Sequence, residues 1–150
     1  MTKLILIVAL SVAACVGLTQ CARVAPGRSD VVERQPDGPD GDHVLAAALA
    51  NHQSNVEVQG SGIVTKVLAD DNDGSRHQRF ILRVASGQTV LIAHNIDISK
   101  KIDSLKEGDQ VSFKGEYEWN SKGGVIHWTH HDPEGRHSSG WIRHNGKIYQ

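Results

Sequence analysis

The sequence predicts a mainly β domain, a small five-stranded barrel preceded by one helix and carrying a short helix between its third and fourth strands. Alternating apolar residues mark five strands, at 56–68, 77–85, 88–94, 110–119 and 125–131. Gly60 and Gly62 interrupt the first strand and predict a bulge at the point where a barrel needs a bend. Ile98, Ile102 and Leu105 recur at helical spacing. This order is that of an OB-fold, with a two-layer α+β sheet as the alternative.

Composition restricts the class of partner. The chain has 150 residues, with 16 Lys and Arg, 17 Asp and Glu, and 9 His. Residues 56–150 hold 12 basic and 12 acidic side chains. Nonspecific nucleic-acid binders carry a positive surplus, which this domain lacks, so nucleic acid is an allowed but not a favoured partner. The high histidine content raises the question of metal or proton chemistry.

Residues 1–21 have the pattern of a signal peptide. Lys3 precedes an apolar run of 15 residues, 4–18, which is shorter than the roughly 20 residues of a membrane span. The segment ending in Cys21 resembles the lipobox of bacterial lipoproteins, whose cysteine is acylated, and the segment ending in Cys15 is the alternative. The sequence therefore predicts export, either as a periplasm-facing lipoprotein tethered to the envelope membrane or as a secreted or periplasmic protein.

The remaining chain divides into a tether and one domain. Residues 22–41 contain three of the four prolines and few apolar side chains, which is typical of a flexible tether. Residues 42–150 form a single domain with a C-terminal tail. Asp42 is expected to cap a helix whose Leu45, Ala48 and Leu49 cover the outer face of the second strand near Ile81. Both cysteines lie in the leader, so the domain has no disulfide and no thiolate ligand.

Turn positions predict the pairing of two hairpins. A two-residue turn at Ser86-Gly87 places Arg79 opposite His94. This patch would clamp a phosphate or carboxylate, unless its arginines pair with the acidic segment 70–73. The turn at 120–123 places Glu116 opposite His127, and Trp128 over Gly115. The tail is expected to fold back beside these residues and close a pocket. The candidate ligand-binding residues are Arg76, His77, Arg79, His94, Asn95, Glu116, His127, Trp128, Thr129, His131, His137 and Trp141.

A metal site is a weaker expectation. His127 and His131 lie about 13 Å apart along a regular strand, at roughly 3.3 Å per residue, which is too far for one ion. Beyond the strand, a turn at Pro133 would allow the metal set His130, His131, Asp132 and His137. No cofactor is expected, and a divalent metal such as zinc is the alternative. The structural alternative is that these side chains hydrogen-bond the tail.

Five separated segments resemble a known family. They are GSRHQRFIL at 74–82, IAHNID at 92–97, GEYEWN at 115–120, GGVIHWTHHDP at 123–133 and GWI at 140–142. Together they resemble a bacterial secreted or lipoprotein domain family of unknown function recognised by its HWTH motif, over about 42–150. The resemblance implies an exported protein and assigns no catalytic residue.

Two functions of different classes follow. The favoured one is an envelope-tethered OB-like binding module for a polar ligand, anions included, such as an oligosaccharide, a nucleotide or a protein partner. The alternative is a metal-dependent hydrolase, a phosphodiesterase for example, that uses the His/Asp cluster. The motifs of serine hydrolases and of phosphate-binding glycine loops do not occur.

Overall fold

The computed structural model describes residues 39–150, and the leader, both cysteines and residues 22–38 of the predicted tether lie outside them. The described elements are α1 (Pro39–Ala50), β1 (Val56–Val67), β2 (His77–Val84), β3 (Thr89–Asn95), β4 (Gln110–Glu118), β5 (Val125–His127), β6 (Trp141–His144) and β7 (Lys147–Tyr149). Since α1 begins at Pro39, the last three residues of the predicted tether are helical instead. Within 39–150, no helix has the length and apolar character needed to cross a membrane.

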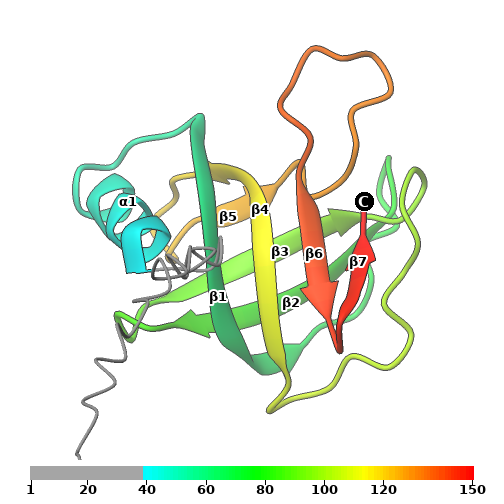
Figure 1. Cartoon of the computed structure of the whole chain (residues 1–150), viewed down its shortest axis with the longest axis horizontal. Coiled ribbons are helices and arrows are strands. Elements are labelled where there is room, and N and C mark those ends of the chain that lie inside the picture. The colour runs from blue at the N-terminus through cyan, green and yellow to red at the C-terminus, as the bar shows by residue number, and fades with distance from the viewer. Residues whose placement is uncertain (1–38) are drawn as a thin grey trace, which may run out of the picture. The chain divides into compact units, whose positions relative to one another are not determined.

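The five-stranded barrel is confirmed (Figure 1). The strands follow the order β1-β2-β3-β5-β4, and β4 pairs with β1 to close the ring. The β3–β5 pair is parallel, and the other barrel pairs are antiparallel. Gly62 of β1 pairs with both Val84 of β2 and Val111 of β4. A Cβ at Gly62 would lie 2.7 Å from the carbonyl oxygen of Arg83, so this junction requires glycine.

The predicted bulge at Gly60–Gly62 is wrong. Val58 and Val64 are both buried, and the inward-facing alternation runs unbroken between them through the two glycines. The register shifts between Val64 and Lys66 instead. The glycines therefore permit the close approach of the neighbouring strands, and Ile63, next to Gly62, is exposed.

The predicted helix at 98–105 is also wrong, because β3 is followed by turns up to Gln110. Ile102 is buried as expected, but a side chain satisfies its backbone groups. The Gln78 amide donates to the Ile102 carbonyl at 2.9 Å and accepts from the Ile102 N–H at 2.8 Å. These bonds hold the segment against β2, and Ile98 remains exposed.

Helix α1 lies alongside β1 (Figure 1). Leu45 and Ala48 are buried in the same core as Val58 and Phe113, and Leu49 packs against that core. The expected cover over Ile81 is therefore wrong. The apolar side chains of the barrel interior are accessible beside β1, and the helix packs its own apolar residues against them.

The C-terminal residues fold back on the barrel, as predicted, and form a hairpin of β6 and β7. One edge of β4 pairs with β5 at 116–118 and with β6 at 111–114. Gly115 lies where β4 changes partner. The loop at 128–140, drawn in orange in Figure 1, connects β5 to β6, and its residue Thr129 packs against Gly115.

Candidate ligand-binding groove beside β4

The polar face of β4 positions the site. Phe113, Gly115 and Tyr117 point inward and are buried, so Lys114, Glu116 and Glu118 project outward. On one side Glu116 pairs with Glu57 of β1, and on the other it pairs with His127 of β5. The predicted register between Glu116 and His127 is confirmed.

The loop at 128–140 forms the second wall of the site. Trp128 has φ +52°, a left-handed conformation that turns the chain out of β5. The Asp132 carboxylate accepts backbone N–H bonds from Glu134, Arg136 and His137, at 2.9, 2.6 and 2.9 Å. These bonds keep the pKa of Asp132 below its usual value. The ordered loop stacks the His137 ring on the Trp128 indole, with centroids 3.9 Å apart and planes 17° apart.

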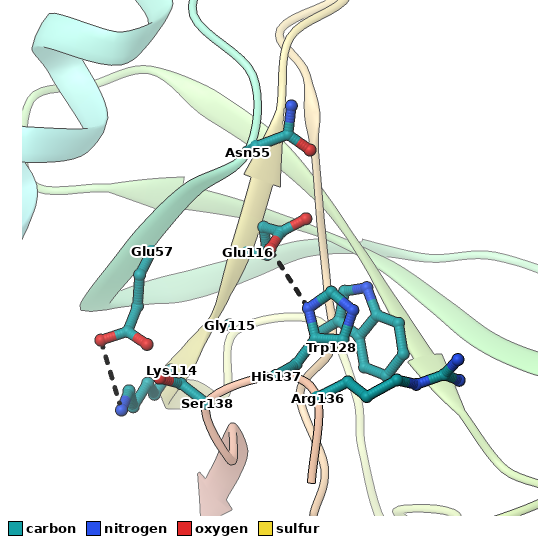
Figure 2. Close-up of a pocket in the computed structure, with 9 residues that line it drawn as sticks. All are labelled: Asn55, Glu57, Lys114, Gly115, Glu116, Trp128, Arg136, His137 and Ser138. Atoms are coloured by element: carbon teal, nitrogen blue, oxygen red, sulfur yellow. Dashed lines mark ion pairs between the residues drawn. The ribbon is translucent and has the colours of Figure 1, made fainter. Parts of the chain in front are cut away.

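Between these walls lies a cavity of about 260 Å³ (Figure 2). Ion pairs line it, since Lys114 lies 3.4 Å from Glu57 and His137 lies 3.7 Å from Glu116. Ser138 donates a hydrogen bond to Glu57, which is the largest cause of the lowered pKa of that carboxyl. We call this cavity the β4 groove. Its lining residues are Asn55, Glu57, Lys114, Gly115, Glu116, Trp128, Arg136, His137 and Ser138.

A second cavity of about 300 Å³ shares Trp128 with the β4 groove. It brings together four of the predicted ligand-binding residues, His77, Asn95, His127 and Trp128, beside Ala93, Ile98 and His130. The Trp128 side chain therefore contributes to both cavities.

His127 carries an unusual electrostatic environment. Its Nε2 atom lies 3.7 Å from a Glu116 oxygen and 3.9 Å from a Glu118 oxygen, and it is buried without a hydrogen-bond partner. Burial lowers the pKa of the imidazole, although the two carboxylates oppose that shift. The ring therefore holds a nitrogen next to two carboxylates at distances longer than a hydrogen bond.

The predicted anion clamp at the β2–β3 hairpin is not assembled. The loop has three residues, with Gly87 at φ +84°, so Gln78 and not Arg79 pairs with His94. The slip of one residue turns His94 into the core. Arg79 instead pairs with Asp71 at 3.4 Å, and Arg76 pairs with Asp97 at 2.7 Å.

His94 and Thr129 are part of the protein interior. The Nε2 atom of His94 donates to the Lys100 carbonyl at 3.3 Å, because a carbonyl can only accept, and Nδ1 accepts from the Thr129 hydroxyl at 2.9 Å. His94 is completely buried, which lowers its pKa to about 4. Neither residue is accessible to a ligand.

The predicted metal set is not brought together. Asp132 is occupied by the loop backbone, the Nδ1 atom of His130 bonds the His131 carbonyl at 2.8 Å, and His131 bonds Ser139 at 3.0 Å. His137 stacks on Trp128. Among the described residues, the group whose donor atoms do gather is Glu116, Glu118 and His127.

Two other expectations differ in detail. The space above Gly115 is filled by the carbonyl oxygen of His127 and by the methyl carbons of Ile126 and Thr129, and not by the Trp128 indole. Trp141 lies on β6 opposite Lys114 of β4, with the Arg143 guanidinium 4.9 Å from its ring centroid. It does not line the groove.

Five residues that line the groove could not be predicted from the sequence, because only the β1–β4 register and the path of the 128–140 loop bring them together. They are Asn55, Glu57, Lys114, Arg136 and Ser138.

Residues 35–150 match the family described as "Protein of unknown function (DUF3465)". None of the curated proteins matches the chain. The match covers the whole described domain, in agreement with the expectation of a family without an assigned activity.

Proposed function

The chain belongs to the DUF3465 family, and we propose that it is an exported, membrane-tethered binding protein that holds an oligosaccharide in the β4 groove. The observation that carries the proposal is the composition of this groove. Carboxylates, an ammonium, an amide and a hydroxyl surround the stacked rings of Trp128 and His137. Such a mixture of donors and acceptors beside an aromatic wall suits the hydroxyl groups and the apolar ring faces of a sugar.

Charge balance favours a sugar over a phosphate. Two acids, Glu57 and Glu116, face two bases, Lys114 and Arg136. Both bases have acidic partners, since Lys114 pairs with Glu57 and Arg136 pairs with Glu134. A strongly anionic ligand such as a nucleotide would have to displace these pairs, whereas a neutral sugar can bond them as they stand.

The surface that OB-folds use to bind nucleic acid also disfavours a nucleotide ligand. That face lies over β2 and β3. The outward residues of these strands include no Phe, Tyr or Trp on which a base would stack, and the one such ring beside them is that of Trp128 at the second cavity. The outward residues are His77, Arg79, Ile81 and Arg83 of β2, and Thr89, Leu91, Ala93 and Asn95 of β3.

No second function is proposed from the hydrolase alternative. Of its predicted ligands, His130, His131 and Asp132 are engaged in other hydrogen bonds, and the His137 ring stacks on Trp128.

The binding proposal is tested by titrating neutral oligosaccharides, uronate-containing oligosaccharides and mononucleotides into the protein by calorimetry. Neutral oligosaccharides are expected to bind most tightly. Glu116→Gln should weaken that binding by about 10- to 100-fold, because a hydrogen bond to a charged group contributes about 1.5–3 kcal/mol. Glu107→Gln changes an exposed carboxylate outside the groove and is the matched control. Tightest binding of nucleotides, or equal affinity in the two variants, would contradict the proposal.

The tether is tested separately. Acylation at Cys21, or at Cys15 in its place, should direct the chain to the membrane fraction, because two lipid chains hold a protein at a bilayer. Mass spectrometry of the mature N-terminus checks the modification, with Cys21→Ser and Cys15→Ser compared. A soluble, unmodified mature chain that begins after Cys21 would leave secretion without an anchor.

A further inference from the structure

One cluster of side chains is not explained by the oligosaccharide groove. Glu116 and Glu118 are two residues apart on β4 and so project from the same face, and His127 pairs with Glu116 from β5. One carboxylate oxygen from each glutamate and one imidazole nitrogen lie within 4.8 Å of one another. Two neighbouring strands therefore aim three donor groups at one point.

The separation of these atoms fits an ion between them. The Nε2 atom of His127 is 3.7 and 3.9 Å from the two oxygens. Hydrogen bonds of this type are about 2.7–3.2 Å long. Ligand atoms that surround one zinc ion at about 2.0–2.2 Å lie roughly 3.4 Å from each other in a tetrahedral arrangement. The two nitrogen–oxygen distances are close to the spacing of zinc ligands and too long for hydrogen bonds.

The ring nitrogen of His127 also lacks a hydrogen-bond partner. Nε2 is buried and has no hydrogen-bond partner, and buried polar atoms are nearly always satisfied. An imidazole nitrogen without a hydrogen-bond partner can offer its lone pair to a metal ion.

From this arrangement we propose that Glu116, Glu118 and His127 form a binding site for one divalent transition-metal ion, zinc above all. An imidazole donor favours zinc over magnesium and calcium, which prefer oxygen ligands alone. The other oxygen of Glu116 lies 3.7 Å from Nδ1 of His137 (Figure 2), so this histidine is the neighbour of the carboxylate on the side of the β4 groove.

The proposed ion would retain an open position. Three protein ligands leave the fourth site of a tetrahedron for water or for a ligand oxygen. Glu116 lines the β4 groove and His127 lines the second cavity, so the ion would lie between the two. This inference goes beyond the proposed oligosaccharide binding and does not depend on it.

The test is equilibrium dialysis of the untagged full-length chain against zinc, followed by metal analysis. The protein is kept in detergent micelles because of its apolar leader, and Cys15 and Cys21 are replaced by Ser throughout, since they are the sole cysteines and thiolates bind zinc. One zinc per chain is expected. His127→Asn and Glu118→Gln should each weaken binding by at least 10-fold. His131→Asn removes an exposed histidine outside the cluster and should retain one zinc.

X-ray absorption at the zinc edge provides a second readout, with four nitrogen or oxygen ligands and the scattering of one imidazole ring expected. Circular dichroism in chelator shows whether each variant is folded. The proposal is overturned if the parent chain binds no zinc, or if folded His127→Asn retains it. Loss of zinc in His131→Asn would also overturn it, because the ligands would then lie in the 128–140 loop. Glu118 does not line the β4 groove, so its variant separates a failure of metal binding from a failure of oligosaccharide binding.

Discussion

Trp128 adopts a backbone conformation that is unfavourable for a bulky residue, with φ +52°. Strain of this kind costs about 1–3 kcal/mol and persists where the surroundings enforce it. Here the carbonyl of Trp128 lies over Gly140, in a space where any Cβ would clash. A residue under strain that also forms a wall of two cavities is consistent with a role in ligand binding.

Glycine should therefore be a better replacement than alanine at this position. Both variants lose the indole, but only alanine retains the left-handed strain, so Trp128→Gly should unfold with a free energy about 1 kcal/mol higher than Trp128→Ala. Urea denaturation measures the difference. Trp141 lies in the extended strand β6, so Trp141→Gly should there be less stable than Trp141→Ala. If alanine is more stable than glycine at position 128, as is expected at position 141, then residue 128 is not strained.

The two hairpins show what sequence predicts for single residues. The pairing of Glu116 with His127 was predicted because the residues on both sides of the 120–123 turn alternate clearly. The predicted pairing of Arg79 with His94 is wrong by one residue, because Ser86-Gly87 predicts a two-residue turn and the loop has three residues. In a strand, such an error exchanges the buried and exposed faces, and it moved His94 from a surface patch into the core.

At the level of elements, strands were predictable and the irregular segments were not. Ile98, Ile102 and Leu105 have helical spacing, but the long side chain of Gln78 bonds the backbone of Ile102 from another strand. The loop at 128–140 likewise depends on Asp132, whose carboxylate replaces backbone partners for three N–H groups. Hydrogen bonds between a side chain and a distant backbone leave no periodic pattern in the sequence. The β4 groove, which this loop completes, was for that reason found only in part.

At the level of the whole molecule, barrel closure follows from the order of elements, and the extra hairpin follows from unequal strand lengths. β5 has only three residues and pairs with β4 at 116–118. The remaining edge of β4 at 111–114 would expose unpaired backbone groups, and β6 covers it. The same pairing returns the C-terminal residues to the barrel, which places the 128–140 loop beside the polar face of β4.

Buried histidines and engaged carboxylates together determine how the stability of the whole domain depends on pH. His94 has its pKa lowered to about 4, from an ordinary value of 6.5. The unfolded chain takes up a proton near pH 6.5 and the folded chain does not, so His94 contributes stability above pH 6.5 that is lost as the pH falls toward 4. The cause is burial, and the lowered pKa of His127 acts in the same direction. In more acidic solution, stability is lost a second time, because carboxyls with lowered pKa values become protonated in the folded domain. These carboxyls are Glu57, Asp97, Asp109 and Asp132.

Acid denaturation should therefore proceed in two stages, with the first between pH 6.5 and 4. A shift of His94 from 6.5 to about 4 corresponds to a loss of about 3 kcal/mol at pH 4. Urea denaturation at a series of pH values measures this loss. In His94→Gln, whose amide can still bond Thr129 and Lys100 but does not titrate, the first stage should shrink by that amount. His43 is exposed, and His43→Gln should leave the stage unchanged. An equal decline in both variants would assign the first stage to groups other than His94.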